Sequence, residues 1–439
     1  MNFRRVTHLG LVLVLALCAA SCDDTFRPIA IPLNPNPPSG NLFHYAIALS
    51  TNGTAAPGYS SRIDVSGDTE VSSIQMGLGP VHGALLPGGG ELYVANSLDD
   101  SVSVYNPSSA SVIIPTVISL PGGSVPIFVA TTEAANVYVA DSGNGTVAAI
   151  NTGSNVAVII PLAASPAAFR PVAMAETPNG QKLYVANEGN NSVSVITTSD
   201  RVAHTPIPVG MSPVWVAVRS DGRRAYVLNS GSGTISTLDT TTDAVLNTVP
   251  VSAGANFMFY DSVFNRLYVT SNSATTVGVL DVSGDQPSVL AFIDLTAGAN
   301  SPCAAGCVPT AVTVLPDGSR AYVSFYTISG TPSALNASVA VVNTGTNTIT
   351  KFVSLPPATI DTVNATGCAT ARFRLFVAAA PGEGERVYVS NCDSGNTGVI
   401  QTLDDTFAVN LPAPLSAFSA PTPTSQPPLQ NPVFVFPGQ

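Results

Sequence analysis

One short pattern recurs along this chain and constrains its fold more than any other feature. A Tyr-Val pair stands inside an apolar run, and Gly-, Asn- or Ser-rich residues follow it, as in "KLYVANEGNNSVSVI" at 182–196. Successive tyrosines lie 45, 46, 42, 42, 54 and 66 residues apart. Periods of about 40–45 residues that hold several short strands are typical of propeller blades. The seven tyrosines are Tyr93, Tyr138, Tyr184, Tyr226, Tyr268, Tyr322 and Tyr388.

Each repeat predicts four strands joined by hairpins. In the unit at 212–251, "SPVWVAV" is the first strand, "AYVLNS" the second, "GTISTLD" the third and "AVLNTVPV" the fourth. Short β-branched runs separated by Gly, Asn and Asp are the signature of such strands. No stretch after the N-terminal segment keeps a helical period over eleven or more residues. We therefore expect an all-β fold of four-stranded antiparallel blades, with each repeated tyrosine in a packing role.

The two ends of the repeat region complement each other. "FHYAIALS", "SRIDVSG" and "EVSSIQMG" near the start match a second, third and fourth strand, and "NPVFVFPG" at 431–438 matches a first strand. A ring of sheets can close when both termini share one blade, which leaves no unpaired edge at the seam. Counting that shared blade gives eight copies of every strand. We expect an eight-bladed propeller over 43–439, with seven blades and one irregular unit as the alternative.

The repeat resembles the YVTN family of bacterial propellers, in which Tyr-Val is followed by Ala or Thr and then Asn. The resemblance is close at 213–251, although Ser252 replaces the usual closing glycine, and the units around Tyr322 and Tyr388 depart from it through insertions. That family includes surface-layer proteins and lactonase-like propellers. The resemblance thus implies a propeller fold and leaves the activity open.

The N-terminus carries the features of an export signal. Two arginines precede an apolar run over residues 9–20, which is too short to cross a bilayer core of about 30 Å. The next residues, "AASC", end at Cys22 and resemble the lipobox of bacterial lipoproteins; ordinary cleavage that leaves a free Cys22 thiol is the alternative. We expect a signal peptide over 1–21, lipidation of Cys22, a proline-rich tether over 22–42, and a membrane-anchored lipoprotein of the cell envelope facing the periplasm or the cell surface.

Charge and cysteine content narrow the class further. The formal net charge is −11 and there are only two lysines, Lys182 and Lys351, which disfavours nucleic acid as a partner. Four cysteines remain in the propeller, an even number that favours disulfides in an exported protein, and three pairings are possible. We expect the disulfides Cys303–Cys307 and Cys368–Cys392. A four-cysteine zinc site is the alternative, but the paired CxxC spacing of such a site is missing.

Strand direction distributes the loops between two faces. If the first strand of each blade runs from the top to the bottom, the entry loops 296–309 and 356–371 lie on the top face. The connections 326–337 and 51–60, between second and third strands, lie there too, as do all four cysteines. The bottom face receives five basic residues two positions before the repeated tyrosine. They form either a partial positive ring that meets lipid headgroups or solvated charges at turn exits; these residues are Lys182, Arg224, Arg266, Arg320 and Arg386.

The first strands place a second group of residues at the mouth of the central channel, on the top face. The position two residues after the entry proline holds His82, Ala173, Trp215 and Ala311, and Phe128 and Phe434 take matching places. Arginine is unusual in an innermost strand unless it reaches a channel or a carboxylate. A mouth with these side chains can hold a small anionic or aromatic ligand, and packing or ion pairing is the competing interpretation. The candidate ligand-binding residues are His82, Arg170, Trp215, Arg372 and Arg374.

These observations favour a binding or scaffolding propeller over an enzyme. Only His44, His82 and His204 follow the signal segment, and the sequence has no G-x-S-x-G, H-E-x-x-H or C-x-x-C-H motif. We expect a monomeric ring without a cofactor or metal that presents its looped top face to a protein, glycan or small ligand. A lactonase-like hydrolase acting at the central channel is the alternative.

Overall fold

The computed structural model describes residues 45–439 except 54–55, 110–113, 132–134, 299, 331–333, 360–367, 369–370, 381–385, 415–429 and 438–439. All of these described residues belong to one compact unit, 43–439. The predicted signal peptide, the lipidation site Cys22 and the tether lie outside them. Among the described residues no helix is long and apolar enough to span a membrane.

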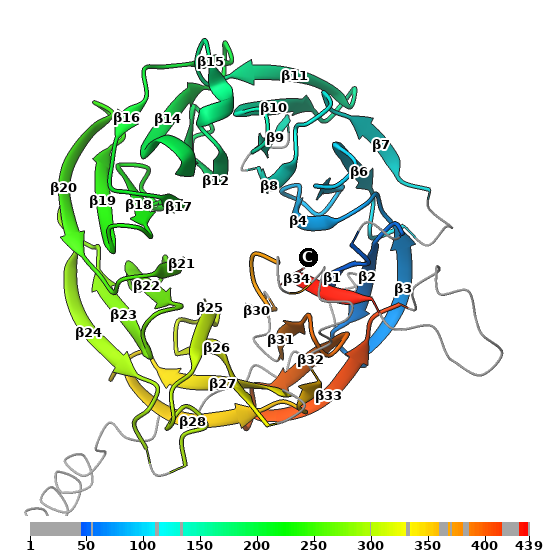
Figure 1. Ribbon diagram of the computed structural model, residues 1–439, viewed down its shortest axis with the longest axis vertical. Helices are drawn as coiled ribbons and strands as arrows, with labels where there is room; N and C mark the ends of the chain where they lie inside the picture. Colours follow the sequence, from blue (N-terminus) through cyan, green and yellow to red (C-terminus); the bar gives the residue numbers. More distant parts are fainter. Residues whose placement is uncertain are drawn as a thin grey trace, which may run out of the picture. The chain divides into compact units, whose positions relative to one another are not determined.

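The described unit is an eight-bladed β-propeller of antiparallel sheets, as the sequence predicts, and Figure 1 shows the blades following one another around a ring. We name the blades A to H. Blade B contains β4 (Pro80–Leu85), β5 (Leu92–Asn96), β6 (Ser101–Tyr105) and β7 (Thr116–Ser119); blade C contains β8 (Pro126–Ala130), β9 (Asn136–Asp141), β10 (Thr146–Asn151) and β11 (Val156–Pro161). Blade D contains β12 (Pro171–Glu176), β13 (Lys182–Asn187), β14 (Ser192–Thr197), β15 (Val202–Ala203) and β16 (Ile207–Pro208).

The remaining regular blades keep the same order from the inside outward. Blade E contains β17 (Pro213–Val218), β18 (Arg224–Asn229), β19 (Thr234–Asp239) and β20 (Ala244–Pro250); blade F contains β21 (Ala255–Asp261), β22 (Arg266–Ser271), β23 (Thr276–Asp281) and β24 (Ser288–Asp294). Blade G contains β25 (Val308–Val314), β26 (Arg320–Ser329), β27 (Ala334–Asn343), β28 (Thr348–Ser354) and β29 (Ala358–Thr359). Blade H contains β30 (Leu375–Ala379), β31 (Arg386–Asn391), β32 (Asn396–Gln401) and β33 (Thr406–Pro412).

Blade A is the shared blade that closes the ring. Its outer three strands come from the start of the unit, and its innermost strand, β34 (Asn431–Pro437), comes from the C-terminus; the former are β1 (Tyr45–Thr51), β2 (Tyr59–Asp64) and β3 (Thr69–Gln75). β34 pairs antiparallel with β1, so that Ala48 lies opposite Val435. Figure 1 shows the red β34 beside the blue β1. The two ends of the repeat region therefore meet as the sequence predicts.

The repeated tyrosines are packing residues. All seven are almost completely buried and rank among the largest buried side chains of the described chain. Every strand that carries one lies second in its sheet, between the innermost and the third strand. A four-stranded sheet has two faces to bury, and only the neighbouring blades of a ring can cover both. The Tyr-Val pattern therefore recurs because the second strand of each of these seven blades must pack between the same kinds of neighbours.

On the bottom face, the basic residues before the tyrosines do not form a free positive ring. Each blade contacts the outer turn of the next one through a side chain at or near this position, so most of these charges are paired or hydrogen bonded rather than solvated. The eight contacts are Tyr45–Ser108, Tyr93–Asn155, Asn136–Arg201, Lys182–Asp243, Arg224–Asp285, Arg266 to the Thr344 carbonyl, Arg320–Asp405 and Arg386–Asp68.

The connection at 326–337 differs from its expected loop. β26 and β27 are ten residues each and continue the hairpin to Ser329 and from Ala334. The register pairs Ser329 with Ala334, and the short β29 adds to this extension through Leu335 and Ala358. The segment "YTIS" alternates apolar and polar residues as a strand does, and the expectation of a loop from Tyr326 onward overlooked this signal. The helices within the described residues are two single 3₁₀ turns, η1 (Pro166–Ala168) and η2 (Glu188–Asn190).

Candidate functional site

A closed cycle of six aromatic rings surrounds the ring axis near the start of the innermost strands. Centroids of consecutive rings lie 4.1 to 5.6 Å apart, and the cycle returns to His82 through Phe434. Blades B, C, E, F, H and A contribute one ring each. We call this group the axial cycle; its members are His82, Phe128, Trp215, Phe257, Phe376 and Phe434.

The local backbone explains why these side chains converge. In seven of the eight innermost strands, all but that of blade H, the pairing register shifts at this point, for example between Pro80 and His82 and between Pro213 and Trp215. Such β-bulges redirect a side chain and commonly occur at the rims of closed sheets. Blades D and G carry the fully buried Ala173 and Ala311 at the equivalent place. Two of the eight innermost strands therefore contribute a small residue instead of a ring, and the six rings of the other blades close on one another.

The side chain of Arg372, at the end of the entry loop of blade H, reaches across the axis. Arg372 Nη1 donates to the carbonyl of Val172 in blade D, and its Nη2 donates to the carbonyl of Val214 in blade E, both at 2.6 Å. Blade D lies opposite blade H in the ring (Figure 1). The guanidinium carbon lies 4.9 Å from the Trp215 ring centroid and 5.8 Å from that of Phe128. The adjoining Phe373 packs edge-on against Trp215 and Phe257.

The electrostatics of this site follow from its enclosure. Arg372 keeps solvent-exposed surface, but blades surround it on most sides; this desolvation lowers its pKa to about 10 and leaves it charged at neutral pH. Desolvation first, and then the charge of Arg372, lower the pKa of His82 to about 3. His82 is therefore neutral, and its Nδ1 accepts the backbone N–H of Val129 at 3.2 Å. A neutral ring with an occupied Nδ1 carries its proton on Nε2.

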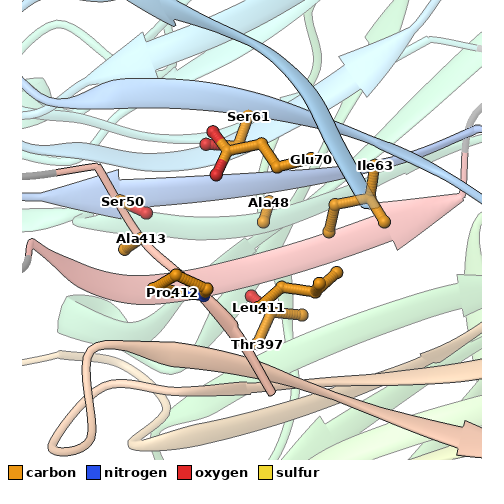
Figure 2. Close-up of a pocket in the computed structure, with 9 residues that line it drawn as sticks. All are labelled: Ala48, Ser50, Ser61, Ile63, Glu70, Thr397, Leu411, Pro412 and Ala413. Carbon is orange, nitrogen blue, oxygen red and sulfur yellow. The ribbon is translucent and has the colours of Figure 1, made fainter. Parts of the chain in front are cut away.

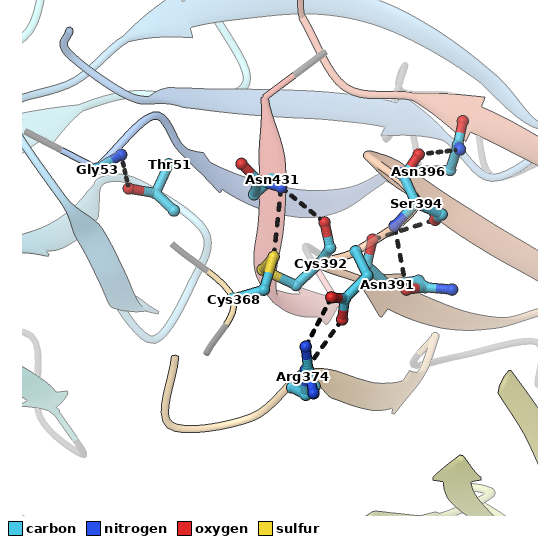
Figure 3. Close-up of a disulfide and its surroundings, with 10 residues drawn as sticks. Thr51, Gly53, Cys368, Arg374, Asn391, Cys392, Ser394, Asn396 and Asn431 are labelled. Atoms are coloured by element: carbon cyan, nitrogen blue, oxygen red, sulfur yellow. Dashed lines mark hydrogen bonds and ion pairs between the residues drawn. A yellow bond between two sulfur atoms is a disulfide. The ribbon is translucent and has the colours of Figure 1, made fainter. Parts of the chain in front are cut away.

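The two expected disulfides are present, Cys303–Cys307 and Cys368–Cys392. The second joins the entry loop of blade H, four residues before Arg372, to the turn after β31. Figure 3 shows this bond beside Asn431 of β34, whose Nδ2 lies 3.3 Å from Cys368 Sγ and 2.8 Å from the carbonyl oxygen of Cys392. The loop that carries Arg372 is therefore fastened both to its own blade and to the shared blade.

The predicted ligand-binding residues separate into two groups. His82, Trp215 and Arg372 meet at the axis. Arg374 instead forms a two-pronged ion pair with Asp393, with N–O distances of 2.8 and 3.1 Å. Arg170 pairs with Glu188 at 3.3 Å, and its side chain is 60% exposed. For these two arginines the ion-pairing interpretation describes the contacts.

Sequence reasoning missed three aromatic residues of the site. Phe257 and Phe376 belong to the axial cycle, and Phe373 fills the space beside it. A signal for Phe257 was available, because it precedes its repeat tyrosine, Tyr268, by the same interval that separates Trp215 from Tyr226. The missing entry proline concealed this match. No repeat position corresponds to Phe373, which lies in an insertion.

A small groove lies elsewhere, at the junction of blades A and H. Figure 2 shows its lining, which includes Ser50 and Glu70 of blade A and Thr397 and Leu411 of blade H. Its walls are mostly apolar, and it contains no cluster of nucleophile and base. Among the residues that the structure describes, no three His, Cys, Asp or Glu side chains come together as a metal site requires.

Comparison with known proteins identifies a shared fold and does not identify an activity. No family model and no curated protein matches the chain. The solved structure of dihydro-heme d1 dehydrogenase NirN in complex with DHE is 15% identical, with 87% of this chain and 76% of that chain covered and a TM-score of 0.63. Apo AztD from Citrobacter koseri is 11% identical over 90% of this chain and 98% of its own, with a TM-score of 0.60. At such identities the likeness shows a shared β-propeller fold.

Proposed function

We propose that this protein is a lipid-anchored, extracytoplasmic propeller that binds a protein, glycan or small ligand through its top face. The observation that carries this proposal is the fastened entry loop of blade H, which places Arg372 and Phe373 on the axial cycle. Binding sites usually lie on loops that a rigid scaffold positions. A disulfide and an asparagine hold this loop, so its side chains are preorganised for contact.

The location is supported by the cysteines and by the N-terminal sequence. Disulfides persist in oxidising compartments outside the cytosol, and two are present. The lipobox-like "AASC" supports acylation of Cys22, and the proline-rich 22–42 then acts as a tether. We expect radioactive palmitate to label the protein in its host, and the Cys22→Ser variant to remain unlabelled and to leave the membrane fraction. A labelled Cys22→Ser variant would contradict this assignment.

The binding surface is tested by crosslinking from both faces. A photoreactive phenylalanine analogue is placed at Met211, which is 56% exposed in the entry loop of blade E, or at Leu403, which is 80% exposed in an outer turn on the bottom face. We expect the Met211 probe to capture a discrete partner in envelope extracts and the Leu403 probe to capture none. Equal capture from both faces would contradict a top-face site.

A lactonase-like hydrolase at the centre of the ring is the second candidate. The YVTN resemblance favours it, because lactonase-like propellers are among the relatives of that family. The neutral His82 is the only histidine in the axial cycle, so a hydrolase would depend on it as a general base. A screen of lactones and esters tests this candidate. Turnover that the His82→Ala variant loses would establish the hydrolase against the binding proposal.

A further inference from the structure

Blade D contributes no ring to the axial cycle, and we call the place where the carbonyls of Val172 and Val214 lie beside Phe128 and Trp215 the notch. The neighbouring blades C and E contribute Phe128 and Trp215, but blade D contributes the buried Ala173 between them. Phe128 and Ala173 belong to one packed cluster, and Trp215 packs against that cluster. Phe128 and Trp215 meet edge-on, with ring centroids 5.6 Å apart. The Arg372 guanidinium lies against both rings and is hydrogen bonded to the backbone of blades D and E.

The contacts of Arg372 define what the notch recognises. Two backbone carbonyls, those of Val172 and Val214, accept its terminal N–H groups at 2.6 Å. The guanidinium carbon lies 4.9 Å from the ring centroid of Trp215 and 5.8 Å from that of Phe128. Aromatic faces attract cations through their quadrupole, and the effect grows when water is excluded. The notch therefore offers electron-rich rings and hydrogen-bond acceptors in one place.

Arg372 is held differently from its neighbour Arg374. Arg374 pairs with the carboxylate of Asp393, as structural arginines commonly do. The contacts of Arg372 are two carbonyls and three aromatic rings, those of Phe128, Trp215 and Phe373. It also comes from blade H, on the far side of the ring. A side chain that reaches across the axis into a site built by blades C, D and E behaves as an occupant of that site.

We propose that this notch is a binding site for a guanidinium group, and that Arg372 is its built-in occupant. The inference rests on the proposed binding function and gives it a ligand class: an arginine side chain of a partner, or a small guanidinium compound. A ligand must displace Arg372 to enter, so the Arg372 side chain itself controls access. This cationic ligand differs from the small anionic or aromatic ligand that the sequence suggests.

The chemistry of the notch predicts its selectivity. The two carbonyls require N–H donors, which a tetraalkylammonium ion lacks. The rings require a positive charge, which a planar urea lacks. A guanidinium provides five N–H donors in a flat, charged group and satisfies both requirements. The three ligand types therefore separate hydrogen bonding from charge.

The test uses the Arg372→Ala variant, which empties the notch. Trp215 is the only tryptophan of the chain, so its fluorescence reports directly on the site. Methylguanidinium, methylurea and tetramethylammonium are titrated at constant ionic strength. We expect a saturable change with methylguanidinium and an affinity at least about tenfold higher than that of methylurea. Methylurea binding as tightly would overturn the role of charge, and tetramethylammonium binding as tightly would overturn the role of the carbonyls.

Two controls keep the result interpretable. The Arg170→Ala variant removes an exposed arginine of the same face whose partner is the carboxylate of Glu188. This variant should show no fluorescence response of Trp215 to methylguanidinium. If Arg372→Ala folds poorly by itself, the three compounds are compared as folding aids. Recovery with methylguanidinium alone supports the site, and recovery with none of them, or with all three equally, overturns it.

A further titration of the same variant distinguishes the two sources of a guanidinium group. N-acetyl-arginine amide binding as well as methylguanidinium would assign the notch to an arginine within a polypeptide, and exclusion of the amide would assign it to a small guanidinium compound. All measurements use isolated protein. A failed titration therefore removes the guanidinium site and leaves the crosslinking test of the top face unaffected.

Discussion

At the scale of single residues, the end of the second strand carries one recurring polar side chain. Asn96, Asn187 and Asn229 each donate through Nδ2 to two hydroxyl groups of the third strand at 2.9 to 3.1 Å. Blade C has Asp141 at the equivalent position, fully buried, with one hydrogen bond from the Thr146 hydroxyl. Burial raises the pKa of Asp141 to about 7 from an ordinary value of 3.8.

This carboxyl makes the stability of the fold depend on pH. The folded state binds the Asp141 proton more tightly than the unfolded state, so its contribution is fully present below pH 4 and is lost as pH rises to about 7. We expect Asp141→Asn to stabilise the protein above pH 7, by an amount on the order of a few kcal/mol at most, and to have little effect at pH 4. Urea unfolding at both pH values measures the difference.

The reverse substitution provides the matched control. Asn187→Asp introduces a carboxyl at the same place in blade D, beside Ser192 and Ser194. The free energy of unfolding of the Asn187→Asp variant should fall between pH 4 and pH 8 more steeply than that of the wild type. If neither variant changes the pH profile, Asp141 is not the group that titrates.

At the scale of elements, each blade is joined to the next through its second strand. Tyr184 of β13 donates to Asp243 in the outer turn of blade E at 2.6 Å, and Tyr322 of β26 reaches Asp405 in the same way. Both acceptors have a positive φ, of 55° and 54°, which places the carboxylate at a left-handed turn residue. The hydroxyl of Tyr388 has no hydrogen-bond partner within the described part of the chain. The same tyrosine therefore serves two roles, packing everywhere and hydrogen bonding in particular blades.

Removing one hydroxyl tests the hydrogen-bonding role. Tyr184→Phe leaves the ring in place but removes the bond to Asp243, whose carboxylate keeps Lys182 as a partner. We expect a loss of about 1–2 kcal/mol in the free energy of unfolding. Tyr388→Phe should change it by less than about 0.5 kcal/mol, because no bond is lost. Equal losses in chemical denaturation would show that the tyrosine hydroxyls act through something other than these contacts.

The same elements show how far sequence predicts this structure. A residue that repeats with its blade, such as Trp215 or Tyr226, has its place fixed by the period, and the fold, the strand order and the central position of His82 were predicted in this way. Arg372 and Phe373 belong to an insertion, so no neighbouring copy indicates that their side chains reach the axial cycle. The partner of a repeated charge such as Arg386 lies in the next blade, here Asp68, and pairing between blades is invisible within one repeat.

At the scale of the whole molecule, one strand connects the seam to the candidate site. β34 completes the sheet of blade A through its pairing with β1. Phe434 of the same strand lies 4.4 Å from both His82 and Phe376 and thus closes the axial cycle. Asn431 at its start holds the disulfide of blade H. Closure of the ring and assembly of the site therefore depend on the same strand.

Deleting residues 430–439 should consequently remove both together. The loss would leave the buried β1 without its partner strand and expose apolar side chains of β1 such as Ile47 and Leu49, so we expect the truncated chain to lose its cooperative unfolding transition and to aggregate. A synthetic peptide of residues 430–437 added during refolding should restore the transition and the environment of Trp215. The same peptide with Phe434→Ala should restore it at least about tenfold less well, because a buried ring contributes several kcal/mol. A truncated chain that unfolds cooperatively and keeps the Trp215 emission of the intact protein would show that the propeller folds without β34.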